Sequence, residues 1–314
     1  MTENIPLIVI VGPTACGKTA LAVELAKRLD GEVVSGDSMQ IYQKMDIATA
    51  KPTFQEMEGI PHHLLDFVAP DDTSFSVADY VPLAHNCIEE IAQRGKTPIL
   101  AGGTGMYISS VVENITFAEI ESSPEVRSKL TALCQRKGSQ YLYEQLKEID
   151  PQLAEKLHPN NEGRVIRALE VYELTGVPMS EHQRRSRLVP GRYQVCMIGL
   201  NFRDRQKLYE RINHRVDLMI EAGLLEEARE IRRIYCGTAC QAIGYKELEP
   251  YFLGNESLQT CIENLKRATR RYAKRQLTWF RREKNIHWLY VDDYELPQDI
   301  VNQAQKIVHS ENIL

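Results

Sequence analysis

The sequence predicts an α/β protein, in which helices flank a mostly parallel sheet and an all-helical domain is inserted into it. Two observations favour this class. Short apolar segments alternate with helical patterns in the first third of the chain, which is typical of a parallel sheet covered on both faces. A strand pattern returns near residue 193 after a purely helical stretch. We therefore expect a core made of residues 1–120 and 190–314, with residues 121–189 as the insertion.

The elements of the first third follow from local patterns. Residues 7–11 are an uninterrupted apolar run that stops at Gly12-Pro13, which predicts a buried strand. Residues 18–29 repeat leucine at every fourth position before Asp30-Gly31, which predicts a helix and its end. Further strands are expected at residues 32–35 and 97–101, and a further helix at residues 79–94.

Beyond residue 120, strand patterns disappear and helices follow one another. Pro124 near the start and Gly138 past the end mark the first helix. The other helices of the insertion are expected at residues 141–149, 151–157 and 162–174. The core resumes with a strand at residues 193–200 and continues through helices to a last strand at residues 286–291.

Size and composition limit the class of protein. The chain has 314 residues, of which 43% are hydrophobic and 26% charged, which excludes collagen-like and wholly disordered chains. The first apolar run is only five residues long and follows no basic segment, so we expect no signal peptide and no membrane partner. Seven scattered cysteines without a Cys-x-x-Cys pair favour reduced thiols and a cytoplasmic location.

Residues 12–19 read GPTACGKT and match the phosphate-loop pattern G-x-x-x-x-G-K-[ST] between a predicted strand and a predicted helix. In such a loop, backbone amides point at an anion, Lys18 adds a positive charge and the Thr19 hydroxyl can ligate Mg²⁺. The motif predicts a P-loop-type core that binds a diphosphate or triphosphate. The residues expected to bind it are Gly12, Thr14, Ala15, Cys16, Gly17, Lys18 and Thr19.

The motif alone leaves open what happens to the phosphate. An NTPase usually has a second acid at the end of a neighbouring strand, but the strand at residues 97–101 ends in Gly102-Gly103-Thr104. The nearest acid in topology is Asp37, after the strand at residues 32–35. If that strand neighbours the first one, Asp37 lies beside the phosphate loop at the edge where α/β sheets bind ligands. There it can ligate Mg²⁺ or accept a proton.

One predicted helix is strongly basic. The chain has a net charge of −5, yet residues 264–284 contain nine basic residues and one acid, a charge of +8. Arg267, Arg271 and Arg275 recur every fourth residue, so they lie along one flank and repel each other. A phosphate backbone would offset this repulsion, because each neutralised phosphate releases counterions. A solvated face and a nucleic-acid contact both fit this pattern.

Several segments together resemble the tRNA dimethylallyltransferases, also called tRNA isopentenyltransferases. The resemblance covers essentially the whole chain, in blocks that read GPTACGKT, GDSMQIYQKMDIATAKP, PHHLLD, AGGTGMY, HPNNEGRVIRALEVYELTG, QAIGYKE and ATRRYAKRQLTWFRR. It implies transfer of a dimethylallyl group from its diphosphate to the N6 amine of the adenine just 3′ of the anticodon. The tRNAs concerned read codons that begin with U, and the reaction needs Mg²⁺. Separately, nothing in the sequence demands more than a monomer.

The resemblance also assigns roles to residues. Asp37 accepts the proton of the adenine amine, Lys18 and Thr19 hold the leaving diphosphate with Mg²⁺, and Thr19 is the metal ligand. Arg215 is the second cation at the diphosphate, and Thr104 lies at the reaction centre. The residues expected to contact the tRNA anticodon stem-loop are Asp37, Ser38, Met39, Gln40, Thr104, Arg127, Gly163, Arg164, Val165, Ile166, Arg167, Gln241, Ala242, Ile243, Gly244, Tyr245, Lys246, Arg267, Arg271 and Arg275.

Five other residues invite a functional interpretation. Cys16 stands where the family more often has serine, and its place among amides at a helix N-terminus predicts an acidified thiol. Trp279 and Phe280 can stack on bases, but core packing at the end of an amphipathic helix is the preferred interpretation. His62 and His63 have no third ligand at metal-site spacing, which favours a structural or substrate-loop role.

Three other functions compete with tRNA prenylation. A nucleoside or metabolite kinase would explain the phosphate loop, but it leaves the missing second acid and the basic helix unexplained. An isopentenyltransferase that acts on free adenine nucleotides would need neither the basic helix nor a large insertion. A non-catalytic RNA-binding module would leave the phosphate loop without a role.

Overall fold

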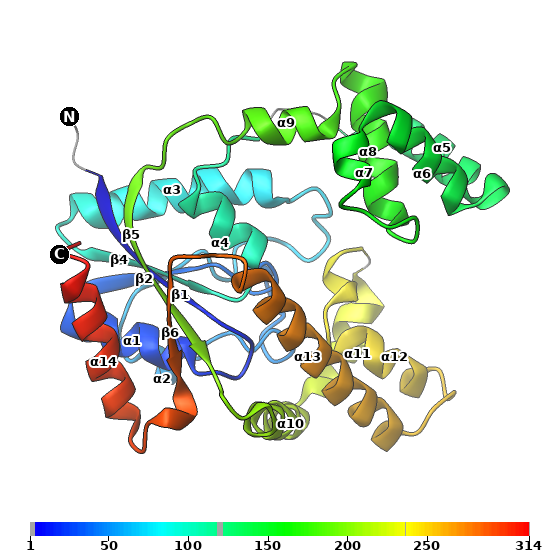
Figure 1. Ribbon diagram of the computed structural model, residues 1–314. Coiled ribbons are helices and arrows are strands. Elements are labelled where there is room, and N and C mark those ends of the chain that lie inside the picture. The colour runs from blue at the N-terminus through cyan, green and yellow to red at the C-terminus, as the bar shows by residue number, and fades with distance from the viewer. Residues whose placement is uncertain (1–3, 118–121, 236, 314) are drawn as a thin grey trace. The chain divides into compact units, whose positions relative to one another are not determined.

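The computed structural model describes residues 4–117, 122–235 and 237–313 (Figure 1). Its six-stranded sheet has the order β3-β2-β4-β1-β5-β6, and each neighbouring pair is parallel. This confirms the predicted α/β class. The strands are β1 (Ile5–Val11), β2 (Gly31–Ser35), β3 (His62–His63), β4 (Thr97–Gly102), β5 (Tyr193–Asn201) and β6 (Ile286–Tyr290).

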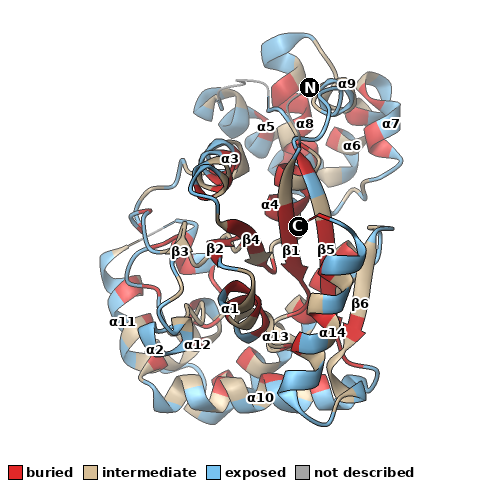
Figure 2. Cartoon of the chain, turned by 90° about the vertical axis from the view of Figure 1, so that its left-hand side faces the viewer, coloured by how far each residue is buried: buried red, intermediate tan, exposed pale blue. Residues whose placement is uncertain are grey.

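Helices cover both faces of this sheet (Figure 1). Ile8 and Ile10 of β1 pack with the first and last helices, α1 and α14, while Leu7, Val9 and Val11 pack with α3 and α4 on the other face. Successive side chains of a strand point to opposite faces, so a strand covered on both sides is apolar throughout. Residues 7–11 are indeed buried, as Figure 2 shows for β1. The bounds of these helices are α1 (Lys18–Arg28), α3 (Val77–Gln93), α4 (Gly105–Val112) and α14 (Pro297–Ser310).

The basic helix is α13 (Leu258–Phe280), and it contributes to three separate apolar clusters. Ala273 packs with α1 and α14, whereas Phe280 packs with α3 and α4. Leu265 belongs to a third cluster, built by further helices. Phe280 is fully buried, so the preferred interpretation of core packing is confirmed at this residue. The further helices are α2 (Phe54–Met57), α10 (Arg205–Glu221), α11 (Leu224–Ile234) and α12 (Tyr245–Phe252).

Residues 113–191 form a second compact unit, and residues 1–112 and 192–314 form the first. The second unit is helical, with an apolar core that includes Leu130, Leu142 and Leu169. Its expected first residue, 121, lies outside the described residues. The helices of this unit are α5 (Pro124–Lys137), α6 (Ser139–Ile149), α7 (Pro151–Ala154), α8 (Glu162–Thr175) and α9 (Met179–Arg185).

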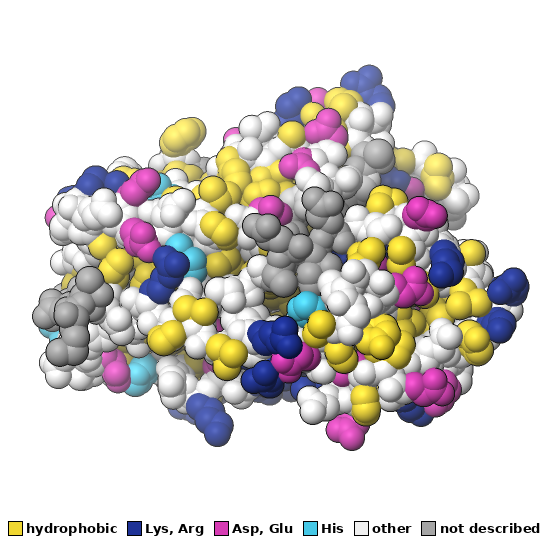
Figure 3. Space-filling model, turned by 90° about the horizontal axis from the view of Figure 1, so that it is seen from above, with side chains coloured by type: hydrophobic (Ala, Val, Ile, Leu, Met, Phe, Trp, Pro, Cys, Tyr) yellow, Lys and Arg dark blue, Asp and Glu magenta, His cyan; other side chains and the backbone are white. Residues whose placement is uncertain are grey.

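Charged, apolar and other side chains are interspersed on the face drawn in Figure 3. Within residues 4–117, 122–235 and 237–313, no helix has both the length and the apolar character that crossing a bilayer requires.

Candidate active site at the phosphate loop

The phosphate loop connects β1 to α1 in a conformation that only small residues allow. Gly12, Ala15 and Gly17 have φ values of 147°, 64° and 95°. A Cβ atom on Gly12 would lie 2.4 Å from the carbonyl oxygen of Leu200, so a larger residue would displace β5 or the loop. The Lys18 ammonium donates to the Pro13 carbonyl over 2.8 Å, which folds this side chain back over the loop. The motif therefore has the local structure that an anion site needs.

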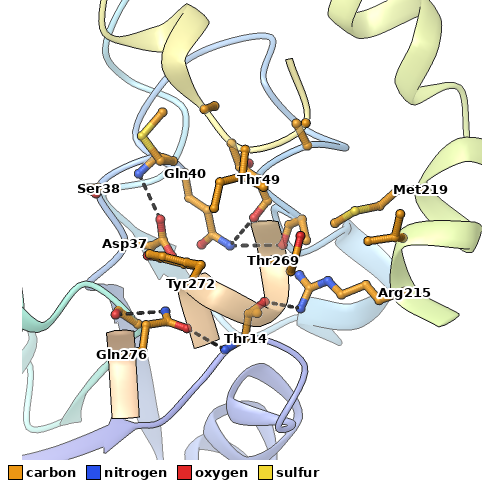
Figure 4. Close-up of a pocket in the computed structure, with 18 of the residues that line it drawn as sticks. Thr14, Asp37, Ser38, Gln40, Thr49, Arg215, Met219, Thr269, Tyr272 and Gln276 are labelled. Carbon is orange, nitrogen blue, oxygen red and sulfur yellow. Dashed lines mark hydrogen bonds between the residues drawn. The ribbon is translucent and has the colours of Figure 1, made fainter. Parts of the chain in front are cut away.

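A cavity of about 340 Å³ opens over the phosphate loop (Figure 4). It collects side chains that are far apart in the sequence. Thr14, Lys18 and Thr19 line it from the loop and the start of α1, and Asp37 lines it from the segment after β2. The other lining residues used below are Ser38, Met39, Gln40, Ala48, Thr49, Ala50, Gly102, Gly103, Arg215, Gln241, Ala242, Ile243, Gly244, Lys246, Thr269, Tyr272, Arg275 and Gln276.

Asp37 reaches this cavity by a route that the sequence did not predict. β2 is not a neighbour of β1, because β4 lies between them. The chain after β2 instead crosses the end of β4, where the Thr104 amide donates to the Gly36 carbonyl over 3.2 Å and the Ser38 amide donates to the Thr104 hydroxyl over 2.9 Å. A Cβ on Gly102 would lie 2.2 Å from the Gly36 carbonyl oxygen, so the crossing requires glycine there. The crossing carries Asp37 over to the phosphate loop.

Asp37 is held in place by a hydrogen bond within its own segment. Its Oδ1 accepts a hydrogen bond of 2.9 Å from the Met39 amide, which fixes the carboxylate at the cavity wall. Figure 4 shows Asp37 beside the ring of Tyr272. Burial, followed by the nearby Asp37 carboxylate, raises the pKa of the Tyr272 hydroxyl.

Two arginines of α10 approach the phosphate loop from one face of the helix. The Arg215 guanidinium donates to the Thr14 hydroxyl over 3.3 Å, and the Arg211 guanidinium donates to the Ala15 carbonyl over 3.0 Å. Burial lowers the pKa of Arg215, while the Asp37 carboxylate opposes that change. Arg215 thus lies where the resemblance places the second cation. Arg211 is a loop contact that sequence reasoning missed.

Gln276 of α13 joins the phosphate loop to the end of β4. Its Oε1 accepts from the Thr14 amide over 2.8 Å, and its Nε2 donates to the Gly103 carbonyl over 3.0 Å. The side chain is buried, and a Cβ on Gly103 would lie 2.2 Å from Nε2. The end of β4, where an NTPase would have its second acid, is therefore occupied by the side-chain amide of Gln276. Only the presence of a polar residue on the less charged flank of a basic helix could have indicated this contact.

The cavity also contains most of the expected tRNA contacts of the first unit. Residues 37–40 line one wall, and residues 241–244 with Lys246 line another. Tyr245 is fully buried, so its side chain supports this second wall from inside. Gly244 has a φ of 116°, and a Cβ there would lie 3.3 Å from the Cβ of Ala48. Ala48, which also lines the cavity, thus packs against this second wall.

In the second unit, two expected tRNA contacts share a buried carboxylate. Arg127 and Arg167 donate to Glu170 over 2.8 and 2.9 Å, and Glu170 is fully buried. Burial alone would raise the pKa of Glu170, but the two arginines outweigh it and hold the pKa below its ordinary value. Val165 and Ile166 pack in the apolar core of this unit, so their side chains face inward.

The basic residues of α13 divide into two rows with different environments. Lys266 pairs with Asp217 over 2.7 Å, and Arg270 donates to Asn213 over 2.5 Å, so this row attaches α13 to α10. Arg267 and Arg271 are exposed and form no hydrogen bond or ion pair with any described residue. Arg275 is exposed as well, lines the cavity and lies over the Tyr272 ring. The outward row is the one expected to meet RNA.

The expectation of an acidified Cys16 thiol is wrong. The side chain is 2% exposed and packs into the apolar cluster between the sheet and α1. Burial raises its pKa, and the opposing effect of the Lys18 charge is smaller. The loop backbone faces the cavity, but the Cys16 side chain faces the core.

Cys16 should therefore resist alkylation. In the folded protein at neutral pH, we expect iodoacetamide to leave Cys16 unmodified, because a buried neutral thiol is a poor nucleophile. After denaturation it should react. Peptide mass spectrometry measures both states, with half-buried Cys87 as the internal comparison. Rapid labelling of Cys16 in the folded protein, suppressed by pyrophosphate, would instead indicate an exposed thiol.

The sequence is similar to that of known proteins over most of its length. The family model described as IPP transferase matches residues 40–283. A tRNA dimethylallyltransferase of Thermoanaerobacter sp. (strain X514) is 53% identical over 95% of this chain and 96% of its own length. The protein of the same name from Bacillus subtilis (strain 168) is 50% identical over 96% of this chain and 95% of its own.

Two solved structures show the same architecture. The full-length tRNA isopentenylpyrophosphate transferase of Bacillus halodurans superposes with a TM-score of 0.71 at 46% identity, over 98% of both chains. A eukaryotic dimethylallyltransferase described as acting on tRNA gives a TM-score of 0.77 at 30% identity, over 97% of this chain and 78% of that chain.

Proposed function

The chain belongs to the tRNA dimethylallyltransferase family, and from this premise we propose the reaction that its cavity supports. The enzyme is a prenyltransferase that moves the dimethylallyl group of dimethylallyl diphosphate to the N6 amine of the adenine 3′ of the anticodon, in tRNAs that read codons beginning with U. Diphosphate is released. The observation that carries this proposal is that the phosphate loop and the Asp37 carboxylate line one cavity.

The phosphate loop has the groups that a leaving diphosphate needs. An allylic carbon–oxygen bond breaks more easily when the charge that develops on the diphosphate is neutralised. Lys18 and Arg215 place two positive charges at the cavity, beside a loop of the type that binds anions through its backbone amides. In the proposed reaction, this loop holds the diphosphate that leaves, whereas in a kinase it would hold a phosphate group that is transferred.

Mg²⁺ fits this site as a partner of the diphosphate. The described part of the chain contains no group of three or more His, Cys, Asp or Glu side chains suited to a metal ion. Mg²⁺ is usually held by one or two protein groups together with substrate phosphates and water. Thr19, at the cavity beside Lys18, is the residue that would hold it. When bound, the ion adds charge neutralisation to the leaving group.

Asp37 supplies the proton acceptor for the nucleobase. An adenine amine is a weak nucleophile, so a carboxylate that accepts its proton as the carbon–nitrogen bond forms lowers the barrier. The Met39 amide orients this carboxylate before the substrate arrives. The adenine must leave the stack of the anticodon loop to reach it, which costs a few kcal/mol that contacts to the RNA backbone offset.

The outward arginines of α13 and the helical unit favour tRNA over a free nucleotide as the acceptor. A mononucleotide would use the cavity alone. Arg267 and Arg271 are exposed, without a partner among the described residues, on the helix whose Gln276 contacts the phosphate loop. They are suited to backbone phosphates of an RNA that delivers its base to this cavity.

A transfer assay tests the proposal. The protein is incubated with radiolabelled dimethylallyl diphosphate and either tRNA that lacks the modification or AMP, and separately with γ-labelled ATP. We expect label in tRNA only, and none in a tRNA that has guanine in place of the target adenine. Label in AMP but not in tRNA would support the free-nucleotide enzyme. Phosphate transfer from ATP would support a kinase.

Neutralising the outward row should change how tRNA binding depends on salt. For Arg267→Gln, Arg271→Gln and Arg275→Gln together, we expect the slope of log K against log [salt] to become shallower by about 2 to 3, since each lost phosphate contact removes about 0.7 to 0.9. Binding is measured by fluorescence anisotropy over a salt series. The matched control replaces three exposed basic residues on other helices, Lys207, Arg233 and Lys306. An unchanged slope in the first variant would mean that this row faces water.

A further inference from the structure

Glu227 of α11 accepts four hydrogen bonds, although it is not among the residues that line the cavity. Its Oε2 accepts from the amides of Asp46 and Ile47 over 2.9 and 2.7 Å. Its Oε1 accepts from the Ala48 amide over 2.9 Å and from the Tyr245 hydroxyl over 2.9 Å. A carboxylate is the side chain that only accepts hydrogen bonds, so it alone suits three consecutive amides and a hydroxyl.

These four donors belong to two neighbouring walls of the cavity, formed by residues 46–50 and by residues 241–246, which approach each other at Ala48 and Gly244. We call residues 46–50 the Ile47 loop. Three of its residues line the cavity, and Tyr245 lies between the lining residues Gly244 and Lys246. Since Gly244 and Ala48 approach each other closely, a shift of either wall changes the width of the cavity. Glu227 binds both walls at once.

The Ile47 loop in turn orients Gln40. The carbonyls of Thr49 and Ala50 accept from Gln40 Nε2 over 3.2 and 3.0 Å, and the Gln40 Oε1 accepts from the Ser35 hydroxyl over 3.3 Å. Amide nitrogen and oxygen are thereby held in one orientation. Gln40 lies in the same short segment as Asp37, and both side chains line the cavity (Figure 4). Glu227 is therefore connected to Gln40 through the backbone of the Ile47 loop, which is hydrogen-bonded to both side chains.

We propose that Glu227 is a positioning residue for prenyl transfer, which holds the Ile47 loop and residues 241–246 at the separation that admits the target adenine. It does so without touching substrate. This inference rests on the proposed function, because it concerns the nucleobase end of the same cavity. The diphosphate end is held by other contacts, those of Gln276, Arg211 and Arg215. Loss of the Glu227 carboxylate should therefore weaken the use of tRNA and leave the binding of the diphosphate unchanged.

Glu227→Gln is the test variant, because glutamine has the same shape but presents an NH₂ group to donors. Its matched control is Glu226→Gln, which makes the same charge change at the preceding, exposed residue. For Glu227→Gln we expect kcat/KM for tRNA to fall about 10-fold to 100-fold, the scale of a misplaced substrate. The inhibition constant of pyrophosphate should stay within about two-fold of the wild-type value. Glu226→Gln should match the wild type in both measurements.

Two further measurements separate positioning from simple loss of structure. Hydrogen exchange in the free protein should show faster exchange of the Ile47 and Ala48 amides in Glu227→Gln, with α1 unchanged. Combining Glu227→Gln with Gln40→Ala should give less than the product of the two single effects, because both act through one set of contacts.

The outcomes are distinct. Parallel loss of pyrophosphate affinity, tRNA turnover and folded fraction would overturn the inference, as would a Glu227→Gln enzyme that behaves like Glu226→Gln. If the wild-type protein fails to prenylate tRNA at all, the proposed function fails. The exchange measurement then still reports whether Glu227 holds the Ile47 loop.

Discussion

Replacing Asp37 with alanine should lower kcat by about 10² to 10⁴-fold, the usual contribution of a positioned proton acceptor. The reason is local. The carboxylate lines the cavity with the phosphate loop and has no second acid beside it among the cavity-lining residues. The dissociation constant for tRNA should change by less than about three-fold, because the loss falls on the transition state. Single-turnover kinetics and a binding titration with the same tRNA give the two numbers.

Two variants make this result specific. Asp37→Asn keeps the shape and the bond from the Met39 amide but cannot accept a proton, so it should be nearly as slow as Asp37→Ala. Asp30→Asn removes an exposed carboxylate at the other end of β2, which pairs with Lys96, and should be as active as the wild type. Equal losses of turnover and of tRNA affinity would make Asp37 a binding residue.

Replacing Lys18 with methionine should lower kcat/KM for dimethylallyl diphosphate by about 10² to 10³-fold, as expected when one charge partner of a leaving group is removed. Methionine retains much of the side-chain length, so the effect reports the charge. Inhibition by pyrophosphate should weaken in parallel, while the dissociation constant for tRNA stays unchanged. Steady-state kinetics with pyrophosphate as a product inhibitor measures this.

Lys27→Met is the matched control, since Lys27 lies on the same helix and pairs only with Glu24 and Glu58 among the described residues. It should be fully active. A Lys18→Met enzyme that loses tRNA affinity but keeps its pyrophosphate inhibition constant would show that the phosphate loop binds the RNA and not the donor.

The fold could be predicted from the sequence because its signals are local. A strand buried on both faces must be apolar throughout, and residues 7–11 are. Caps and glycines mark helix ends at short range, as with Gly138 after α5. The order of the strands could not be predicted, because nothing in residues 32–35 specifies that β4 separates β2 from β1.

The residues of the site also divide into those that a local motif identifies and those that it does not. Lys18 and Thr19 belong to a motif of eight adjacent residues, so the sequence identifies them. Gln276 and Glu227 act on partners far along the chain, Thr14 and Ile47, and carry no pattern of their own. The Cys16 prediction failed for a related reason. Its neighbours in sequence are amides at a helix start, but its neighbours in space are apolar side chains of the core.

The central claim is that one cavity holds both the diphosphate and the target adenine, with the Asp37 carboxylate at the adenine amine. A crystal structure with pyrophosphate, Mg²⁺ and an anticodon stem-loop tests it most directly. We expect the adenine outside its stack, with its N6 atom about 2.6 to 3.2 Å from the Asp37 carboxylate, and the pyrophosphate on the phosphate loop, Lys18 and Arg215. An adenine that stays stacked in the RNA, or that enters a different part of the protein, would contradict the account.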